Sequence, residues 1–211
     1  MQPKFEMHAL KIFALCTAAF AVQKLYAPFT GLFGLDSSSV LQRPWTLITY
    51  MFLHANLQHL VSNMFALLLF GLILEKVAGS KNFLKVYFAS GIASGLVGVM
   101  FYDSIVGASG AIFGAMASLA LLRPSLTVWV GYVPMPMVVA LFVWAAADFL
   151  GVFVPDSVAH IGHLAGMLFG VAYTFAYLRQ FMEKPERRYR IRISEETIRE
   201  WEKRYMLAPK G

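Results

Sequence analysis

The sequence predicts an all-α membrane protein, in which a bundle of six transmembrane helices is followed by a short cytoplasmic C-terminal tail. Hydrophobic residues make up 58% of the 211 residues and charged residues only 14%, whereas an ordinary globular domain is about 25% charged. Ten of the 18 Lys and Arg residues lie between Arg179 and Lys210, so the net charge of +6 belongs mainly to the tail. These features exclude a soluble or disordered chain, and they give no support to a nucleic-acid partner.

A helix needs about 20 mainly apolar residues to cross the ~30 Å hydrocarbon layer of a bilayer. Six windows provide them: 9–27, 57–74, 86–102, 104–122, 124–147 and 157–178. The first window also resembles a cleavable signal peptide, with Lys4 before it and small residues near Ala19. Because the apolar run continues to Ala27, we expect a retained helix.

Positive residues predict the orientation, since Lys and Arg concentrate on the cytoplasmic side of membrane proteins. With the N-terminus inside, sixteen Lys and Arg residues are cytoplasmic and only Lys24 and Arg43 lie outside. We therefore expect both termini in the cytoplasm. The transmembrane domain is predicted over 1–180 and the basic polar tail over 181–211, where Ser194 is placed to cap a short amphipathic helix.

Strongly polar side chains are costly inside a membrane and are therefore candidates for function. Counting about 1.5 Å per residue from the inner end of each helix places four of them at a similar depth, about 18–24 Å along. They belong to three different windows and are His59, Asn63, Ser109 and His163. Residues that serve only packing have no reason to share one level.

This set predicts a nucleophilic serine. A serine hydroxyl needs a base to accept its proton, and histidine is the usual base near neutral pH. His59 and Asn63 lie four residues apart on one helix face, where they can join the backbone N–H of Ser109 in stabilising an oxyanion. Because Asp148 and the other aspartates fall near external helix ends, the expected arrangement is a Ser109–His163 dyad.

His54 and His160 fall near the outer interface, where we expect water around them. A zinc site built from His54, His59 and His163 is disfavoured, since no HExxH motif occurs and no carboxylate is expected at that depth. We therefore predict no metal site.

Together these residues resemble the rhomboid family of intramembrane serine proteases over the segment from Pro44 to Gly170. The segment from His54 to Phe65 is similar to the family pattern H-x4-H-x3-N, and it continues through Glu75 as GxxxExxxG. The family's GxSG motif is matched around Ser109, and H-x2-G-x3-G is matched by His163, Gly166 and Gly170. The GxxxG spacing in the last motif also favours close helix association.

The resemblance implies cleavage of peptide bonds in or near transmembrane segments, with Ser109 as nucleophile and His163 as general base. It implies that His59 and Asn63 stabilise the oxyanion, that the substrates are transmembrane proteins, and that no cofactor is needed. Two departures are visible. Trp45 is followed by Thr46 where the family often has Arg, and Phe113 stands where some members have Tyr under the histidine ring.

Two alternatives remain open. One is a catalytically inactive rhomboid-like protein that binds or chaperones membrane proteins. The other is a channel or transporter, although Pro134 and Pro136 in the fifth window have no counterpart in another half of the chain. We expect these prolines to kink a mobile helix on the substrate's path. The compact sequence favours a prokaryotic plasma membrane, and it leaves the oligomeric state and natural substrate open.

Overall fold

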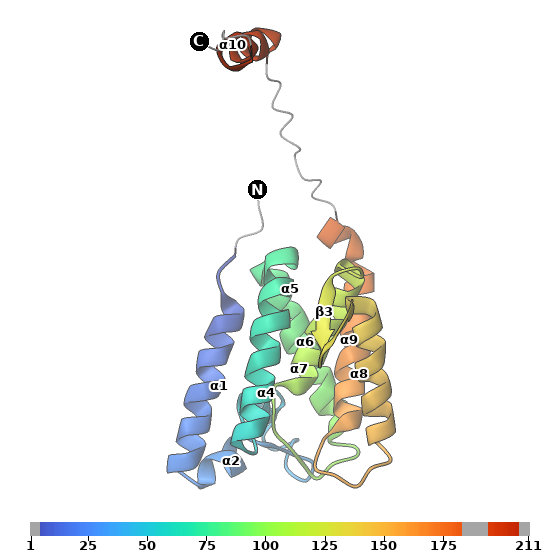
Figure 1. The fold of residues 1–211 in the computed structure, drawn as a ribbon. Coiled ribbons are helices and arrows are strands. Elements are labelled where there is room, and N and C mark those ends of the chain that lie inside the picture. The colour runs from blue at the N-terminus through green and yellow to red at the C-terminus, as the bar shows by residue number, and fades with distance from the viewer. Residues whose placement is uncertain (1–4, 183–193, 207–211) are drawn as a thin grey trace. The chain divides into compact units, whose positions relative to one another are not determined.

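The computed structural model describes residues 5–182 and 194–206. The chain divides into two compact units, residues 1–178 and 179–211. The first unit is a helical bundle (Figure 1). Its main helices are α1 (His8–Leu25), α4 (Leu57–Ala66), α5 (Leu72–Ala78), α6 (Ser80–Gly98), α7 (Ser109–Leu122), α8 (Met137–Gly151) and α9 (His160–Met182).

Shorter elements connect these helices. A π-helix, η2 (Leu67–Gly71), joins α4 to α5 in one helical run. The chain between α1 and α4 contains α2 (Pro28–Phe33), β1 (Leu35–Asp36), α3 (Thr46–Thr49) and η1 (Tyr50–Phe52). Strand β1 pairs antiparallel with β2 (Ser104–Ile105), which precedes α7. Figure 1 shows that α9 runs towards the end of the bundle at which α1 begins.

Two described helices combine the length and the hydropathy of a membrane span, His8–Leu25 and Leu57–Ala78. The apolar helices α7 and α8 are shorter, with 14 and 15 residues. At 1.5 Å per residue they extend roughly 21–23 Å, less than the full ~30 Å hydrocarbon layer. The six-span count and the orientation therefore stay predictions.

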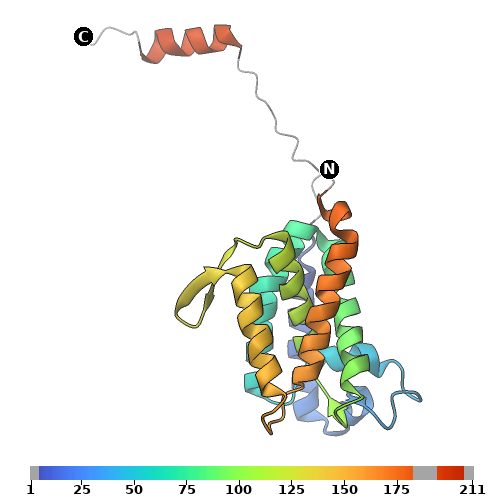
Figure 2. The same ribbon diagram turned by 90° about the vertical axis from the view of Figure 1, so that its right-hand side faces the viewer.

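The fifth window differs from the prediction of one helix over 124–147. Its first part is a β-hairpin made of β3 (Thr127–Val130) and β4 (Val133–Pro136), with Gly131 at the turn in a left-handed conformation (φ +61°). Figure 2 shows this hairpin beside α8, away from the centre of the bundle. The prediction that Pro134 and Pro136 kink a helix is wrong, because both lie in β4 and α8 begins at Met137. Proline lacks the N–H that a helix interior requires, so the helix starts only after the second proline.

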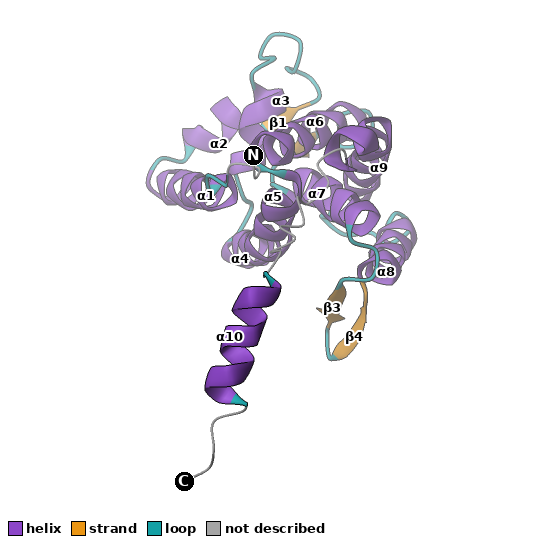
Figure 3. Cartoon of the chain, turned by 90° about the horizontal axis from the view of Figure 1, so that it is seen from above, coloured by secondary structure: helices purple, strands orange, loops and turns teal. Residues whose placement is uncertain are grey.

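Helix α7 occupies the interior of the bundle, and Figure 3 shows it between α5 and α9. Ten of its 14 residues are buried. On the α9 side, a Cβ added at Gly166 would collide with the Gly110 carbonyl, and one added at Gly170 would collide with that of Gly114. The two Gly-x3-Gly patterns therefore face each other and allow backbone-to-backbone contact, the packing mode of small-residue motifs in membranes.

On its opposite side, α7 packs closely against α6, where serine side chains lie against the same two glycines. Side chains of Ser90 and Ser94 on α6 fill the space where a Cβ at Gly114 or Gly110 would lie. Three helices thus meet through residues spaced four apart. The glycines of α9 were expected from the sequence to allow close packing, whereas the serines of α6 were not.

A buried carboxylate fastens α1 to the turn between α5 and α6. Glu75 has 0% of its surface exposed. It accepts hydrogen bonds from the backbone N–H groups of His8 (2.9 Å) and Ala9 (3.0 Å) and from the Ser80 hydroxyl (2.6 Å). These donors satisfy a charge that would otherwise be costly to bury. Gly79 completes the turn at φ +84°, a conformation that glycine adopts readily.

The second unit contains α10 (Glu195–Tyr205). The Ser194 hydroxyl accepts a hydrogen bond from the Thr197 N–H at 3.2 Å, which is an N-cap interaction. Glu195 and Glu196 lie in the first turn, where acidic side chains favour the helix dipole. The domain boundary at 180/181 stays a prediction.

Candidate active site

A serine and a histidine from different helices lie in direct contact. Ser109 is the first residue of α7 and His163 lies in the first turn of α9. Ser109 Oγ is 2.7 Å from His163 Nε2, within hydrogen-bonding distance for a hydroxyl donor and a ring nitrogen acceptor. In this geometry the ring nitrogen is placed to accept the proton of the hydroxyl.

The loop before α7 aims Ser109 towards the cavity. Gly107 has φ +133° and donates its N–H to the Tyr50 carbonyl at 3.0 Å. A Cβ at Gly107 would lie 2.7 Å from His59 Cε1. Two reasons therefore favour glycine at position 107. Its backbone conformation suits glycine, and the absence of a side chain leaves room for the His59 ring.

The other two predicted site residues lie on α4. Asn56 caps this helix by accepting from the His59 N–H at 2.8 Å. Asn63 is 6% exposed, and its Nδ2 donates to the His59 carbonyl at 3.0 Å. The backbone N–H groups of Ser109 and Gly110 lie in the first turn of α7, where a helix provides no carbonyl partner for them.

One cavity of about 700 Å³ brings these groups together. Its lining includes all four predicted site residues, His59, Asn63, Ser109 and His163. Exposed residues Asn56, Ser104 and Ser157, which lie in or beside the connections between the helices, also line it, so the cavity extends to the loops at this end of the bundle. Its apolar part is formed by aromatic and aliphatic side chains, Phe65, Leu69, Phe70, Trp129 and Trp144.

His163 has two further neighbours. Phe113 stacks on its ring with centroids 4.7 Å apart and an interplanar angle of 23°, as the resemblance implied for this position. Asp148 Oδ1, on α8, lies 2.9 Å from His163 Nδ1. The prediction that no acidic residue lies beside this site is therefore wrong, because the end of α8 is placed against the start of α9.

The two histidines that were predicted near the outer interface, His54 and His160, are less solvated than expected. His160 Nδ1 lies 2.6 Å from Asp148 Oδ1, and its Nε2 lies 3.2 Å from Asp156 Oδ2. The Val158 N–H and the His160 ring hold the pKa of Asp156 below its usual range. His54 is 1% exposed, and burial lowers its pKa to about 4. The serine contact is made by His163 and not by His160.

Asp148, His160 and His163 also form a set of possible metal ligands, whose donor atoms lie within 4.8 Å of one another. Imidazole and carboxylate are donors that zinc accepts. The premise that no carboxylate lies at this depth is wrong, and the absence of a metal site stays a prediction.

The family is shown by comparison with known proteins. The rhomboid domain model matches residues 41–180. The chain therefore belongs to the rhomboid family, whose members are integral membrane proteins, and its mostly helical structure is an all-α membrane fold.

Among its relatives, RHOMBOID-like protein 6, mitochondrial, from Arabidopsis thaliana is 35% identical over 150 residues, which cover 69% of this chain and 48% of that protein. Putative rhomboid protease YdcA from Bacillus subtilis is 34% identical over 152 residues, covering 69% of this chain and 71% of that protein. Rhomboid protease GluP from the same bacterium is 38% identical over 91 residues, 41% of this chain and 18% of that protein. This chain thus spans about half of the plant relative and a smaller part of GluP.

Proposed function

We propose that this protein is an intramembrane serine endopeptidase that cleaves transmembrane proteins in or near their membrane-spanning segments. The observation that carries the proposal is the 2.7 Å contact between Ser109 Oγ and His163 Nε2. This contact lies in a cavity that extends to exposed loops, which gives water a route to the site. Two bacterial relatives are named rhomboid proteases.

The first chemical step is acylation. His163 Nε2 accepts the Ser109 proton while Oγ attacks the carbonyl carbon of the scissile peptide, and a tetrahedral oxyanion forms. When this intermediate collapses, the C–N bond breaks and His163 gives its proton to the leaving amine. The new amino terminus departs, and the other fragment remains as an ester on Ser109.

The second step is deacylation. A water molecule loses a proton to His163 Nε2 and attacks the ester carbonyl. Collapse of the second tetrahedral intermediate breaks the bond to Oγ, which recovers the proton from His163. The carboxyl product leaves, and both side chains return to their initial states. This chemistry requires no cofactor.

The substrate is a protein segment that can unwind into the cavity. The polar part of the cavity holds the reacting groups, and its aromatic part offers an apolar surface to a membrane-embedded chain. The distribution of Lys and Arg supports both termini in the cytoplasm, and the cavity then opens on the opposite side of the membrane. The proposed location is a prokaryotic plasma membrane. The relatives described above come from both a plant and a bacterium.

Covalent labelling tests the nucleophile. A fluorophosphonate probe is expected to modify the purified wild-type protein, and mass spectrometry of peptides should place the adduct on Ser109. The label should be lost in Ser109→Ala. Ser104→Ala is the matched control, because Ser104 lines the same cavity and is expected to leave labelling unchanged. An unlabelled wild type that also fails to cut single-span membrane proteins would contradict the proposal and favour a binding or chaperone role.

The oxyanion role of α4 gives a second prediction. Asn63→Ala should lower kcat by about 10²-fold, because one oxyanion donor is typically worth about 10²–10³ in rate. KM for a single-span substrate should change little, since the interaction strengthens only in the transition state. Gln58→Ala serves as the control, because Gln58 is also an amide on α4 that lines the cavity. Equal kcat values for the two variants would remove Asn63 from this role.

His59 is proposed to act beside Asn63. Its ring lies against Gly107, two residues before the nucleophile, so a ring N–H can be directed at the region where the oxyanion develops. The free N–H of Ser109 completes the set of donors.

A further inference from the structure

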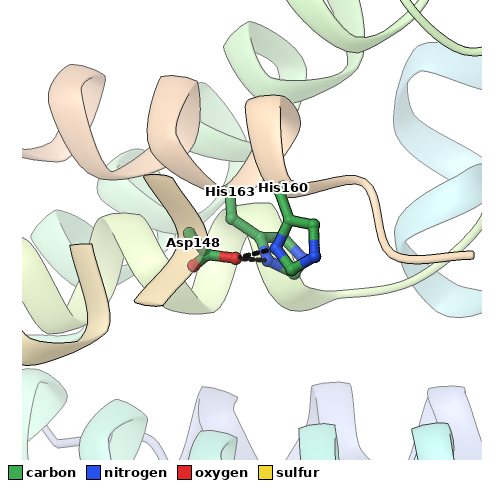
Figure 4. A group of neighbouring side chains, drawn as sticks. All are labelled: Asp148, His160 and His163. Carbon is green, nitrogen blue, oxygen red and sulfur yellow. Dashed lines mark hydrogen bonds and ion pairs between the residues drawn. The ribbon is translucent and has the colours of Figure 1, made fainter. Parts of the chain in front are cut away.

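The carboxylate beside His163 has an unusual environment for a membrane helix. Asp148 lies in the last turn of α8 and is 6% exposed. A buried carboxylate is costly unless hydrogen-bond donors surround it. Figure 4 shows the Asp148 side chain directed at two imidazole rings, with dashed lines to both. Oδ1 lies 2.6 Å from His160 Nδ1 and 2.9 Å from His163 Nδ1.

This arrangement determines which ring nitrogen of His163 carries the proton. An ionised carboxylate only accepts hydrogen bonds, so Nδ1 must be the donor. Neutral His163 then has its lone pair on Nε2, the atom that faces Ser109 Oγ. The tautomer required for a general base is therefore selected by the hydrogen bond at the other side of the ring.

The second histidine holds the carboxylate in place. His160 faces Asp148 through Nδ1 and Asp156 through Nε2. Because both partners accept, the ring can satisfy them only as a doubly protonated imidazolium. Gly151 provides the room, since a Cβ there would collide with the His160 ring. His160 thus bridges α8 to the loop before α9 and fixes the rotamer of Asp148.

We propose that Asp148 is a positioning residue for His163, so that Ser109, His163 and Asp148 act as a three-residue unit with His160 supporting the carboxylate. This inference rests on the proposed function and adds to it. Asp148 orients the imidazole, selects its Nδ1–H tautomer and stabilises the imidazolium that forms as Ser109 attacks. Phe113 supports the face of the same ring.

The test compares Asp148→Asn with Asp156→Asn. The amide at 148 can turn its NH₂ towards Nδ1 and so favour the tautomer with the proton on Nε2, where it blocks proton transfer. We expect kcat for a single-span substrate to fall by about 10²-fold or more, with KM within roughly 3-fold of the wild type. Asp156 contacts His160 and not His163, so it acts on the base only through His160, and Asp156→Asn should lower kcat by much less than Asp148→Asn does.

A spectroscopic measurement keeps the inference testable where Asp148→Asn fails to fold. In the wild type with ¹⁵N-labelled histidine, the His163 ring should carry its proton on Nδ1 at neutral pH, assigned by the loss of its signals in His163→Ala. Observation of the Nε2–H tautomer would overturn the inference, as would Asp148→Asn with the kcat of Asp156→Asn.

Two controls distinguish a positioning role of Asp148 from a metal-binding role and from an inactive protein. A wild type without turnover or labelling refutes the proposed function itself, whereas an active wild type with a fully active Asp148→Asn refutes only the role of Asp148. Turnover should be unchanged in EDTA. Loss of turnover in EDTA, with recovery on adding zinc, would assign Asp148, His160 and His163 to a metal and overturn the positioning role.

Discussion

Replacing His163 by alanine is expected to lower kcat by about 10³-fold or more, because general-base catalysis by a positioned side chain contributes roughly 10²–10⁴ and the serine is a weak nucleophile without it. The variant should still fold, since the ring is partly exposed to the cavity and α9 keeps its glycine contacts with α7. Turnover of a single-span substrate and the rate of fluorophosphonate labelling should fall together.

His8→Ala is the matched control for this loss. His8 lies at the start of α1, where its backbone N–H, and not its ring, binds Glu75. It should retain wild-type turnover. A His163→Ala protein with more than a tenth of wild-type kcat would show that another group accepts the Ser109 proton.

The second large effect is expected from Gly166→Val. The Cβ of valine would collide with the backbone carbonyl of Gly110, which cannot rotate away as a flexible side chain could. Helix α9 must then move away from α7, and His163, one turn before Gly166, moves with it. A misplacement of about 1 Å at the reacting groups can cost about 10²-fold in rate, and overpacking typically costs about 1–3 kcal/mol of stability.

Turnover and thermal inactivation of Gly166→Val should be measured in parallel with Gly31→Ala. A Cβ at Gly31 meets no atom within 4 Å, so this control carries an added methyl group without a collision. We expect the control to match the wild type in both measurements. If Gly166→Val kept its turnover and only its thermal stability fell, contact between α7 and α9 would not be what aligns Ser109 with His163.

Much of the bundle follows from the sequence, because charge-free windows are long and their ends are marked by charged or helix-breaking residues. The four polar residues expected at one depth do line one cavity. The depth of each residue was obtained from only two quantities, the rise per residue of a helix and the position at which each window ends. Neither quantity depends on which helices are neighbours.

The position of Asp148 could not be predicted for the same reason. Counting along helices gives a depth, but it does not say that the last turn of α8 faces the first turn of α9. Two antiparallel helices joined by a short loop bring such residues together, and an acidic residue 15 positions before a candidate base was the available signal. The fifth window also ended too early, at 147, so Asp148 was expected just beyond the helix, whereas it lies within the last turn of α8.

The hairpin and the serines of α6 do not follow from the hydropathy pattern. Thr127–Val130 is apolar enough to pass as part of a span, and hydropathy alone does not distinguish a strand from a helix over so few residues. Ser90 and Ser94 resemble any polar residues in a helix until the facing glycines are known. Their role is defined by a partner and not by their own segment.

The single thiol of the chain has a practical consequence for experiments on this protein. Cys16 is 0% exposed, and its Sγ lies 3.8 Å from the Met51 carbonyl. Because thiol reagents need access to the sulfur, the native protein should give little background with impermeant maleimides. A cysteine introduced at Tyr132, which is 97% exposed at the tip of the hairpin, would then report which face of intact cells the reagent reaches, without prior removal of the natural residue.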